Sequence, residues 1–323
     1  NALDANTTGE LLTAVGKSAL GSNTTGIYCT AVGRNALASN TTGQSNTAVG
    51  MDALEANTGA GQFNSAFGVR ALEANTTGSN NTAVGYYALS LNTTGQANTA
   101  IGRQALQNAT TGNLNLAVGY NTMFQLTTGS DNTAVGNYAG DALTTGHSNV
   151  ALGHIALSGE TTGVRNTALG FHAGQVQNGA DDNVWVGYQC GLSNTTGGQN
   201  TGIGKDALRA NTTASNNVAV GTDSLTANTT GANNIGIGNF ALDANTTANN
   251  NIACGYAALS ANTTGTQNVG IGSAALFNNT TADGNVAIGY ESLKSNTTGA
   301  GNVAVGSGSL DANTTASNNT AVG

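Results

Sequence analysis

The chain contains no proline and very little charge. Only 7% of its 323 residues are charged and 5% are aromatic, whereas about 25% charged residues is usual for soluble domains. Disordered chains of low complexity usually combine high charge with few β-branched residues. Here Val, Ile, Leu and Thr recur at fixed positions, so we expect an ordered chain.

The charge that is present excludes some partners. Eight Lys and Arg residues stand against sixteen Asp and Glu residues, for a net charge of -8. Because there is no basic patch, we expect no nucleic-acid partner. No apolar run approaches the ~20 residues of a membrane span, and the first residues carry neither an initiator Met nor a signal peptide. Since both ends fall inside a repeat, we interpret the sequence as an excerpt of a longer fibre.

A 17-residue repeat runs through the sequence. Its marker is a small–aliphatic–glycine triplet, most often Ala-Val-Gly, whose last residue we call the anchor glycine. Successive anchor glycines such as Gly16 and Gly33 are 17 residues apart, except for the 18 from Gly50 to Gly68. So short a period is typical of a solenoid, in which each repeat forms one coil. The sequence predicts an all-β fold, a β-solenoid (β-roll) of about 19 coils with 17 residues per coil, in one repeat array over residues 1–323.

Four positions of the repeat define the expected strand and core. The Val column precedes the anchor glycine, the Ala column lies two residues before it, and the strand Thr column lies three residues before it. The Leu column follows four residues after the glycine. Side chains alternate along a strand, so the Val and strand Thr columns share a face. Because both are β-branched, we expect that face, including Val135, to form the interior with the Leu column.

The Ala column therefore points outward in this interpretation, yet it holds only Ala or Gly apart from Trp185. A face of small residues suits the close approach of another chain. We predict a subunit interface here, with an intrachain contact or plain exposed alanine as the alternatives. The predicted interface residues are Ala48, Ala100, Ala134, Ala168, Trp185 and Ala219.

Asn recurs at two columns, four residues before and seven residues after the anchor glycine. Stacked identical amides can hydrogen-bond to one another as ladders, and we expect such ladders here. The consensus decays between Asn137 and Gly191, where Gly140, Gly174 and Gly191 replace the core Leu. We therefore predict local distortion in that stretch.

No constellation for catalysis or metal binding is readable. The cysteines Cys29, Cys190 and Cys254 occupy three different columns, so stacking cannot pair them. The three histidines also lie in different columns and lack metal-ligand spacing. A solenoid repeats each side chain from coil to coil and builds rows where an enzyme needs one unique pocket. We expect no enzyme, no cofactor and no metal.

One exposed column could contact a partner. The position directly after the anchor glycine, which we call the aromatic column, could stack on sugars or pack against a neighbour, and scattered surface aromatics are the alternative. Its aromatic members are Tyr86, Tyr120, Phe171, Tyr188, Tyr256 and Tyr290.

The repeat resembles sequences of known fibres. Asn-Thr-Ala-Val-Gly followed by Ala-Leu and Asn-Thr-Thr-Gly, as at Asn46–Gly50 and Asn132–Gly136, is similar to repeats of bacteriophage tail fibres and bacterial surface fibres. It also resembles the head repeats of trimeric autotransporter adhesins, whose period is shorter. The resemblance implies a β-roll, often trimeric, used for attachment.

These observations lead to one expected function and one alternative. We expect a structural and adhesive extracellular fibre shaft on a cell or virion surface, which self-associates as a homotrimer or filament. Surface glycans are a further candidate partner. The alternative is an ice-binding β-solenoid, because Thr-Thr recurs in nearly every coil.

Overall fold

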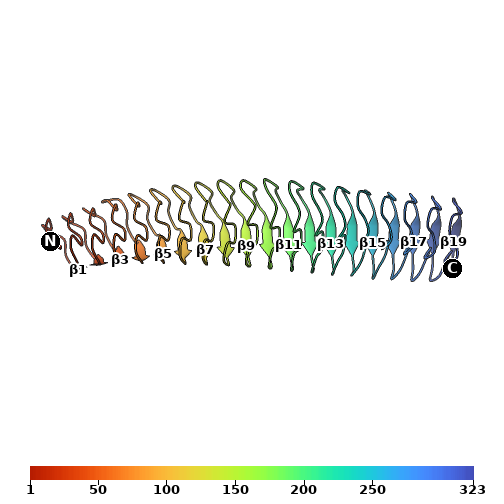
Figure 1. Ribbon diagram of the computed structural model, residues 1–323, viewed down its shortest axis with the longest axis horizontal. Helices are drawn as coiled ribbons and strands as arrows, with labels where there is room; N and C mark the ends of the chain where they lie inside the picture. Colours follow the sequence, from red (N-terminus) through yellow and green to blue (C-terminus); the bar gives the residue numbers. More distant parts are fainter. The chain divides into compact units, whose positions relative to one another are not determined.

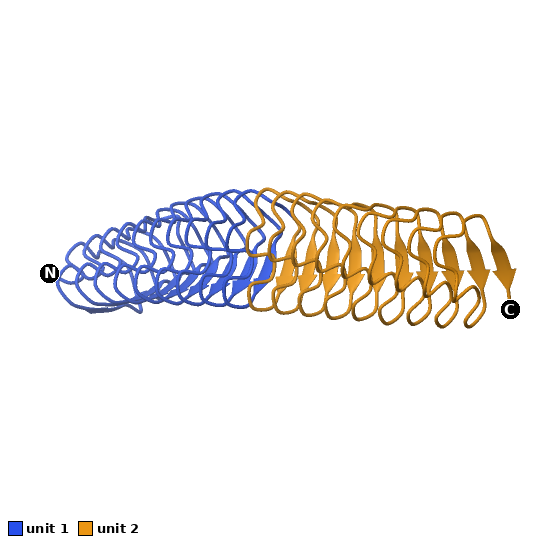
Figure 2. Ribbon diagram, turned by 45° about the vertical axis from the view of Figure 1, so that its right-hand side comes forward, with its two compact units in different colours: residues 1–164 blue, residues 165–323 orange.

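The computed structural model describes residues 1–323 as two compact units, 1–164 and 165–323 (Figure 2). Both units consist of three-residue strands joined by turns. Neither contains a helix, and so no helix is present that could cross a bilayer. The strands of the first unit are β1 (Thr13–Val15), β2 (Thr30–Val32), β3 (Thr47–Val49), β4 (Ser65–Phe67), β5 (Thr82–Val84), β6 (Thr99–Ile101), β7 (Leu116–Val118), β8 (Thr133–Val135) and β9 (Val150–Leu152).

The second unit continues the same pattern with one strand per repeat. Its strands are β10 (Thr167–Leu169), β11 (Val184–Val186), β12 (Thr201–Ile203), β13 (Val218–Val220), β14 (Ile235–Ile237), β15 (Ile252–Cys254), β16 (Val269–Ile271), β17 (Val286–Ile288), β18 (Val303–Val305) and β19 (Thr320–Val322).

Each unit is a β-solenoid. Within a unit every strand pairs in parallel with the next strand along the chain, so the strands lie side by side along one wall of the coils (Figure 1). The register joins equivalent repeat positions, as in Thr13 to Thr30 and Ala14 to Ala31. The predicted all-β solenoid with about 17 residues per coil is confirmed. That residues 1–323 form a single array remains a prediction.

The strands face the opposite way from our expectation. Ala134 is 1% exposed, whereas the neighbouring Val135 is 38% exposed. The interior holds the Ala column, the Ala-Leu pair of the repeat and the two Asn columns, nearly all of them fully buried. So narrow a coil leaves space only for a methyl group at the inward strand position, unless neighbouring positions lose their side chains. The Val and strand Thr columns therefore point outward, and the predicted interior face is wrong.

This orientation also overturns the predicted subunit interface. The six residues assigned to it are at most 1% exposed inside their own coil: Ala48, Ala100, Ala134, Ala168, Trp185 and Ala219. Of the alternatives, the intrachain contact is the one observed. The column is small because it fills the core, and not because another chain approaches it.

Trp185 fits this core because two neighbouring positions hold glycine and leave space for the indole. Its indole Nε1 donates a hydrogen bond to Gln177 Oε1 at 2.8 Å. A Cβ atom at Gly191, in the Leu column, would lie 2.5 Å from Trp185 Cε3, and one at Gly202 would lie 3.0 Å from the same atom. The indole therefore occupies the volume that a leucine and an alanine fill elsewhere.

The turns need left-handed backbone at fixed positions. The anchor glycines have φ between +128° and +144°, and a Cβ atom at Gly119 would lie 2.7 Å from the carbonyl oxygen of Gly136. The Leu column is left-handed as well, for example with φ of 52° at Leu37. The Leu-column glycines Gly140, Gly174 and Gly191 keep this conformation, with φ of 56°, 57° and 60°.

The predicted distortion between Asn137 and Gly191 is therefore wrong for the strands of each unit. The neighbouring strands β8 and β9 keep the register, as do β10 and β11. Glycine adopts the left-handed conformation more readily than leucine, so the replacement does not disturb the turn. Space in the core is refilled locally, since a Cβ atom at Gly140 would lie 2.9 Å from Leu143 Cδ1.

The two Asn columns form the expected ladders, inside the core. In the column seven residues after the anchor, Asn40 Nδ2 donates to Asn23 Oδ1 at 3.0 Å and to the Gly43 carbonyl at 3.1 Å. In the other column the backbone amide of Asn98 donates to Asn81 Oδ1 at 3.0 Å. This first ladder is interrupted after Asn92, whose Oδ1 has no hydrogen-bond partner, because Ala109 occupies the equivalent place in the next coil. The ladder is present again in the second unit, where Asn211 Nδ2 donates to Asn194 Oδ1 at 2.8 Å.

We predict that neighbouring residues of β8 respond in opposite ways to the same charge. Ala134→Asp should lower the free energy of unfolding by on the order of 3 kcal/mol or more, because it buries an unpaired carboxylate. Val135→Asp should cost far less, since its side chain reaches water. Thermal unfolding followed by circular dichroism measures both. Equal melting temperatures would contradict the observed orientation of the strand.

A second prediction concerns Trp185 and Gly191. Trp185→Ala should cost about 3–5 kcal/mol by leaving a cavity, and Gly191→Leu should destabilise by about 1–3 kcal/mol or more through overpacking. The double variant restores the Ala and Leu of the consensus and should be more stable than either single variant. A denaturant-unfolding double-mutant cycle measures this coupling. Additive effects would show that the two side chains do not share one volume.

Candidate functional site

The outward face of the sheet is uncharged throughout and apolar from β13 to β18. Neither the strand Thr column nor the Val column contains a single charged residue. From β13 to β18 these two columns hold only Val and Ile together with Cys254. Ile237 is 42% exposed and Ile271 is 39% exposed. We call this surface the apolar sheet face, and because a solvated sheet face normally carries polar residues, it has the character of an interaction surface.

The predicted aromatic column lies at the surface, as expected from its position in the repeat. Tyr120 is half-buried and the other five members are exposed. They do not form one continuous row. Tyr86 and Tyr120 belong to the first unit, and the remaining four lie in the second.

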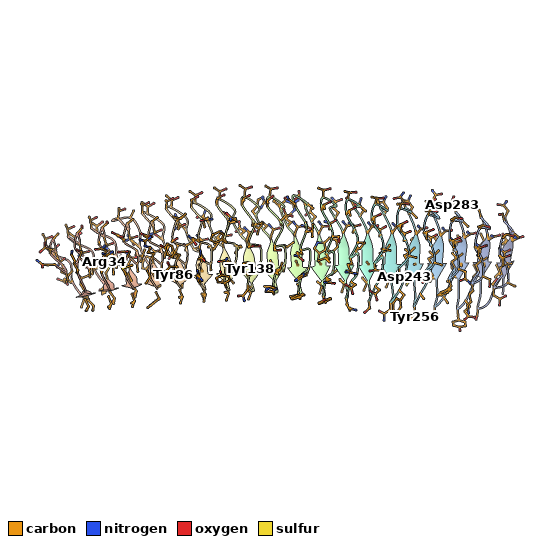
Figure 3. All side chains as sticks on the ribbon, viewed as in Figure 1. Arg34, Tyr86, Tyr138, Asp243, Tyr256 and Asp283 are labelled. Atoms are coloured by element: carbon orange, nitrogen blue, oxygen red, sulfur yellow. The ribbon has the colours of Figure 1, made fainter.

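In the first unit the aromatic column joins a second row that sequence reasoning missed. The guanidinium of Arg103 lies 5.5 Å from the ring centre of Tyr120 and 5.8 Å from that of Tyr86. Tyr138, one position further along its own repeat, packs edge-on against Tyr120 with ring centres 5.3 Å apart. Figure 3 labels Tyr86 and Tyr138 on this unit. We call this group the aromatic stripe, with the members Arg70, Tyr86, Tyr87, Arg103, Tyr120, Tyr138 and His154.

In the second unit the aromatic residues form separate small groups. Phe171 and Tyr188 stack with ring centres 5.6 Å apart, and Tyr256 packs edge-on against Phe240 at 5.9 Å. Tyr290 lies apart from these groups, and a hydrogen bond to Glu291 raises the pKa of its phenol. The six predicted residues are thus distributed over several surface groups, and only two of them belong to the stripe.

A cavity of about 290 Å³ opens at the end of the aromatic stripe, between Tyr138, Asp141, Ile155 and Ser158. The Oδ1 atom of Asp141 is buried and has no hydrogen-bond partner in the chain. Burial raises the pKa of this carboxyl, and the backbone amides of Asp141 and Ala142 oppose that rise. The cavity therefore combines an aromatic ring, an aliphatic side chain, a hydroxyl and a carboxylate acceptor.

Two acidic residues are buried, although Asp and Glu usually lie at the surface. Asp52 is 3% exposed, accepts a hydrogen bond from Asn35 Nδ2 at 3.0 Å and faces Arg34 at 3.5 Å. Glu160, which replaces Asn in a ladder column, is fully buried. Its Oε1 accepts hydrogen bonds from the amides of the following turn, residues 161–163. Both carboxylates are buried and hydrogen-bonded within the chain, so neither suggests catalysis.

No three His, Cys, Asp or Glu side chains converge as a metal site would require. A scan against protein-family models finds no match for this chain, and a search of curated proteins finds none either.

Proposed function

We propose that the chain is a non-catalytic structural shaft that associates with further copies of itself through the apolar sheet face. The observation that carries this proposal is the absence of charge from two whole outward columns, combined with exposed Val and Ile side chains. Monomeric proteins rarely expose contiguous apolar patches larger than a few hundred Å². Covering this face would remove that surface from water.

A second copy of the chain is the occupant that best fits this face. Apolar side chains of the Val column, mostly Val and Ile, recur on it once per coil, at the strand spacing of about 4.8 Å. Only a partner with the same spacing can interdigitate coil for coil, and another copy has that spacing by construction. Although each copy carries a net charge of -8, the face itself is uncharged, so like charges do not meet there. We propose that these copies assemble as a homotrimer or as a filament.

Two observations support the extracellular and adhesive parts of the proposal. The repeat resembles those of tail fibres and surface adhesins, which project binding sites from a virion or a cell. The aromatic stripe adds an exposed surface of tyrosine and arginine on the first unit. We place the chain on a cell or virion surface, where its flank contacts surface glycans.

Ice binding receives less support from the arrangement of the threonines. In the Thr-Thr turn, the first hydroxyl donates to the backbone of the next coil, as Thr24 Oγ1 does to the Thr41 carbonyl at 3.0 Å. In most coils only the second Thr, such as Thr25, is exposed. On the sheet face, Val and Ile replace the strand Thr column from β13 to β18. An ice-recrystallisation assay tests the alternative, and strong inhibition at micromolar concentration would favour it.

Self-association predicts a specific effect of charge on the sheet face. The double variant Ile237→Asp/Ile271→Asp should sediment as a monomer, because assembly would bury its carboxylates without partners. Thr247→Asp/Thr281→Asp adds the same charge to the exposed turns of the same coils and should sediment like the wild type. Analytical ultracentrifugation over a range of concentrations measures both. A wild-type chain that stays monomeric, or a face variant that assembles normally, would refute the proposal.

The natural cysteines allow association through the apolar sheet face to be followed locally. Cys254 lies exposed on the apolar sheet face, whereas Cys29 and Cys190 are buried in the coils. Burial raises the pKa of the Cys190 thiol to about 12 and also raises that of Cys29. A disulfide reagent at pH 8 should therefore modify one thiol in dilute solution, more slowly as assembly covers Cys254. In the Ile237→Asp/Ile271→Asp variant the rate should not depend on concentration, and a concentration-dependent rate there would argue against the assigned face.

A further inference from the structure

The middle of the aromatic stripe carries the only charge in its part of the chain. Between Glu73 and Asp131 the sequence contains no Asp or Glu, and Arg103 is the only charged residue. The chain as a whole is acidic, with a net charge of -8. Arg103 is exposed and has no carboxylate in its own coil or in the coils on either side. Such an isolated cation attracts anions from solution.

Arg103 is also the one arginine without an ion pair. The other four form ion pairs within the chain: Arg34 and Arg70 with Asp52, Arg165 with Asp182, and Arg209 with Asp206. Arg70 is the closest comparison, because its guanidinium also lies over a tyrosine, 5.4 Å from the ring centre of Tyr87. The charge of Arg70 is balanced by Asp52 and Glu73, whereas Arg103 has only tyrosine rings beside it.

Two tyrosines hold Arg103 between them. Tyr86, Arg103 and Tyr120 occupy the same repeat position in three successive coils. The guanidinium lies 5.8 Å from the ring centre of Tyr86 and 5.5 Å from that of Tyr120. Contacts of this kind use the face of the planar guanidinium and leave the N–H donors at its edge for an anion. A carboxylate can accept two of these donors at once.

The rings define the rest of the ligand. Tyr86 is exposed and Tyr120 is half-buried, so both present ring surface to solvent beside the unpaired cation. A tyrosine ring offers apolar surface with a polar hydroxyl at its tip. The residues of an acidic saccharide combine C–H bonds, hydroxyls and a carboxylate. Such a ligand can therefore contact a tyrosine ring and the Arg103 guanidinium together.

We propose that Tyr86, Arg103 and Tyr120 bind a saccharide of hexuronic acids, with a carboxylate paired to the Arg103 guanidinium and sugar C–H bonds against the tyrosine rings. The inference deepens the adhesive part of the proposed function and rests on it, since it names the class of surface glycan that the flank of the shaft contacts. Coils recur about every 4.8 Å, so the two tyrosines contact the sugar residues on either side of the one that pairs with Arg103.

Trigalacturonate is the probe, and saturation-transfer difference NMR of the full chain at physiological ionic strength measures its binding. The wild type should bind trigalacturonate. It should not bind neutral galactotriose, which lacks the carboxylates, or acetyl-triglutamate amide, which has as many carboxylates but no sugar ring. Arg103→Gln should weaken the affinity about tenfold or more, by loss of charge-assisted hydrogen bonds. Arg103→Lys should recover only part of this loss, because an ammonium group cannot pair with a carboxylate bidentately. Tyr120→Ala should also weaken binding.

Arg165→Gln is the matched control, since it removes the same charge from an exposed arginine that Asp182 already pairs. It should leave trigalacturonate affinity unchanged. Absence of wild-type binding, equal binding of galactotriose or of the glutamate peptide, or full affinity in Arg103→Gln or Tyr120→Ala would overturn the assignment. Circular dichroism verifies that each variant is folded. Sedimentation separates the two proposals: a chain that assembles without binding trigalacturonate refutes only the saccharide site, and one that binds without assembling refutes only the shaft.

Discussion

The structure depends on stacking coils in register. Because each strand pairs with the equivalent strand of the next coil, every side chain has its own repeat position above and below it. The anchor glycine sets how closely the coils approach, since a Cβ atom at Gly255 would lie 2.5 Å from the carbonyl oxygen of Gly272. The same closeness makes the coil narrow. Alanine, leucine and asparagine fill its interior, and the β-branched strand residues are left outside.

Variation inside this narrow coil is compensated locally. Trp185 is accommodated by Gly191 and Gly202, and Leu143 by Gly140. Ser224, which replaces an inner Ala, faces Gly236, where a Cβ atom would lie 2.6 Å from its Oγ. Its hydroxyl donates to the Gly236 carbonyl at 2.9 Å. Variation on the outer faces needs no such pairing, and those faces therefore differ from coil to coil in their aromatic and charged residues.

The period and the pattern of Asn made the coils, the strand positions and the amide ladders predictable. They did not show which strand face points inward, because alternation gives two faces without naming the inner one. β-branched residues favour strands on either face, so the β-branching that places Val135 in the interior in our sequence analysis does not distinguish the two faces. The restriction of the Ala column to Ala and Gly, apart from Trp185, indicates that space at this position is limited. The limit comes from the interior of the coil itself and not from another subunit.

The candidate sites were predictable to different degrees. The aromatic column was correctly placed on the surface because its slot also carries charges such as Lys17 and Arg34. The cavity beside Asp141 was not foreseeable. It is lined by residues two and five positions after the anchor glycine in adjacent coils. The directions of their side chains depend on the turn conformation, which the sequence does not give.

Cryo-electron microscopy of the assembled chain tests the orientation of the strands and the proposed association together, because a cross-section shows both the inside of each coil and the contact between copies. We predict alanine methyl groups enclosed within every coil, and Val and Ile side chains of different copies in contact across the apolar sheet face. A cross-section with the Val column inside the coil, or with the Ala columns of two copies in contact, would contradict it.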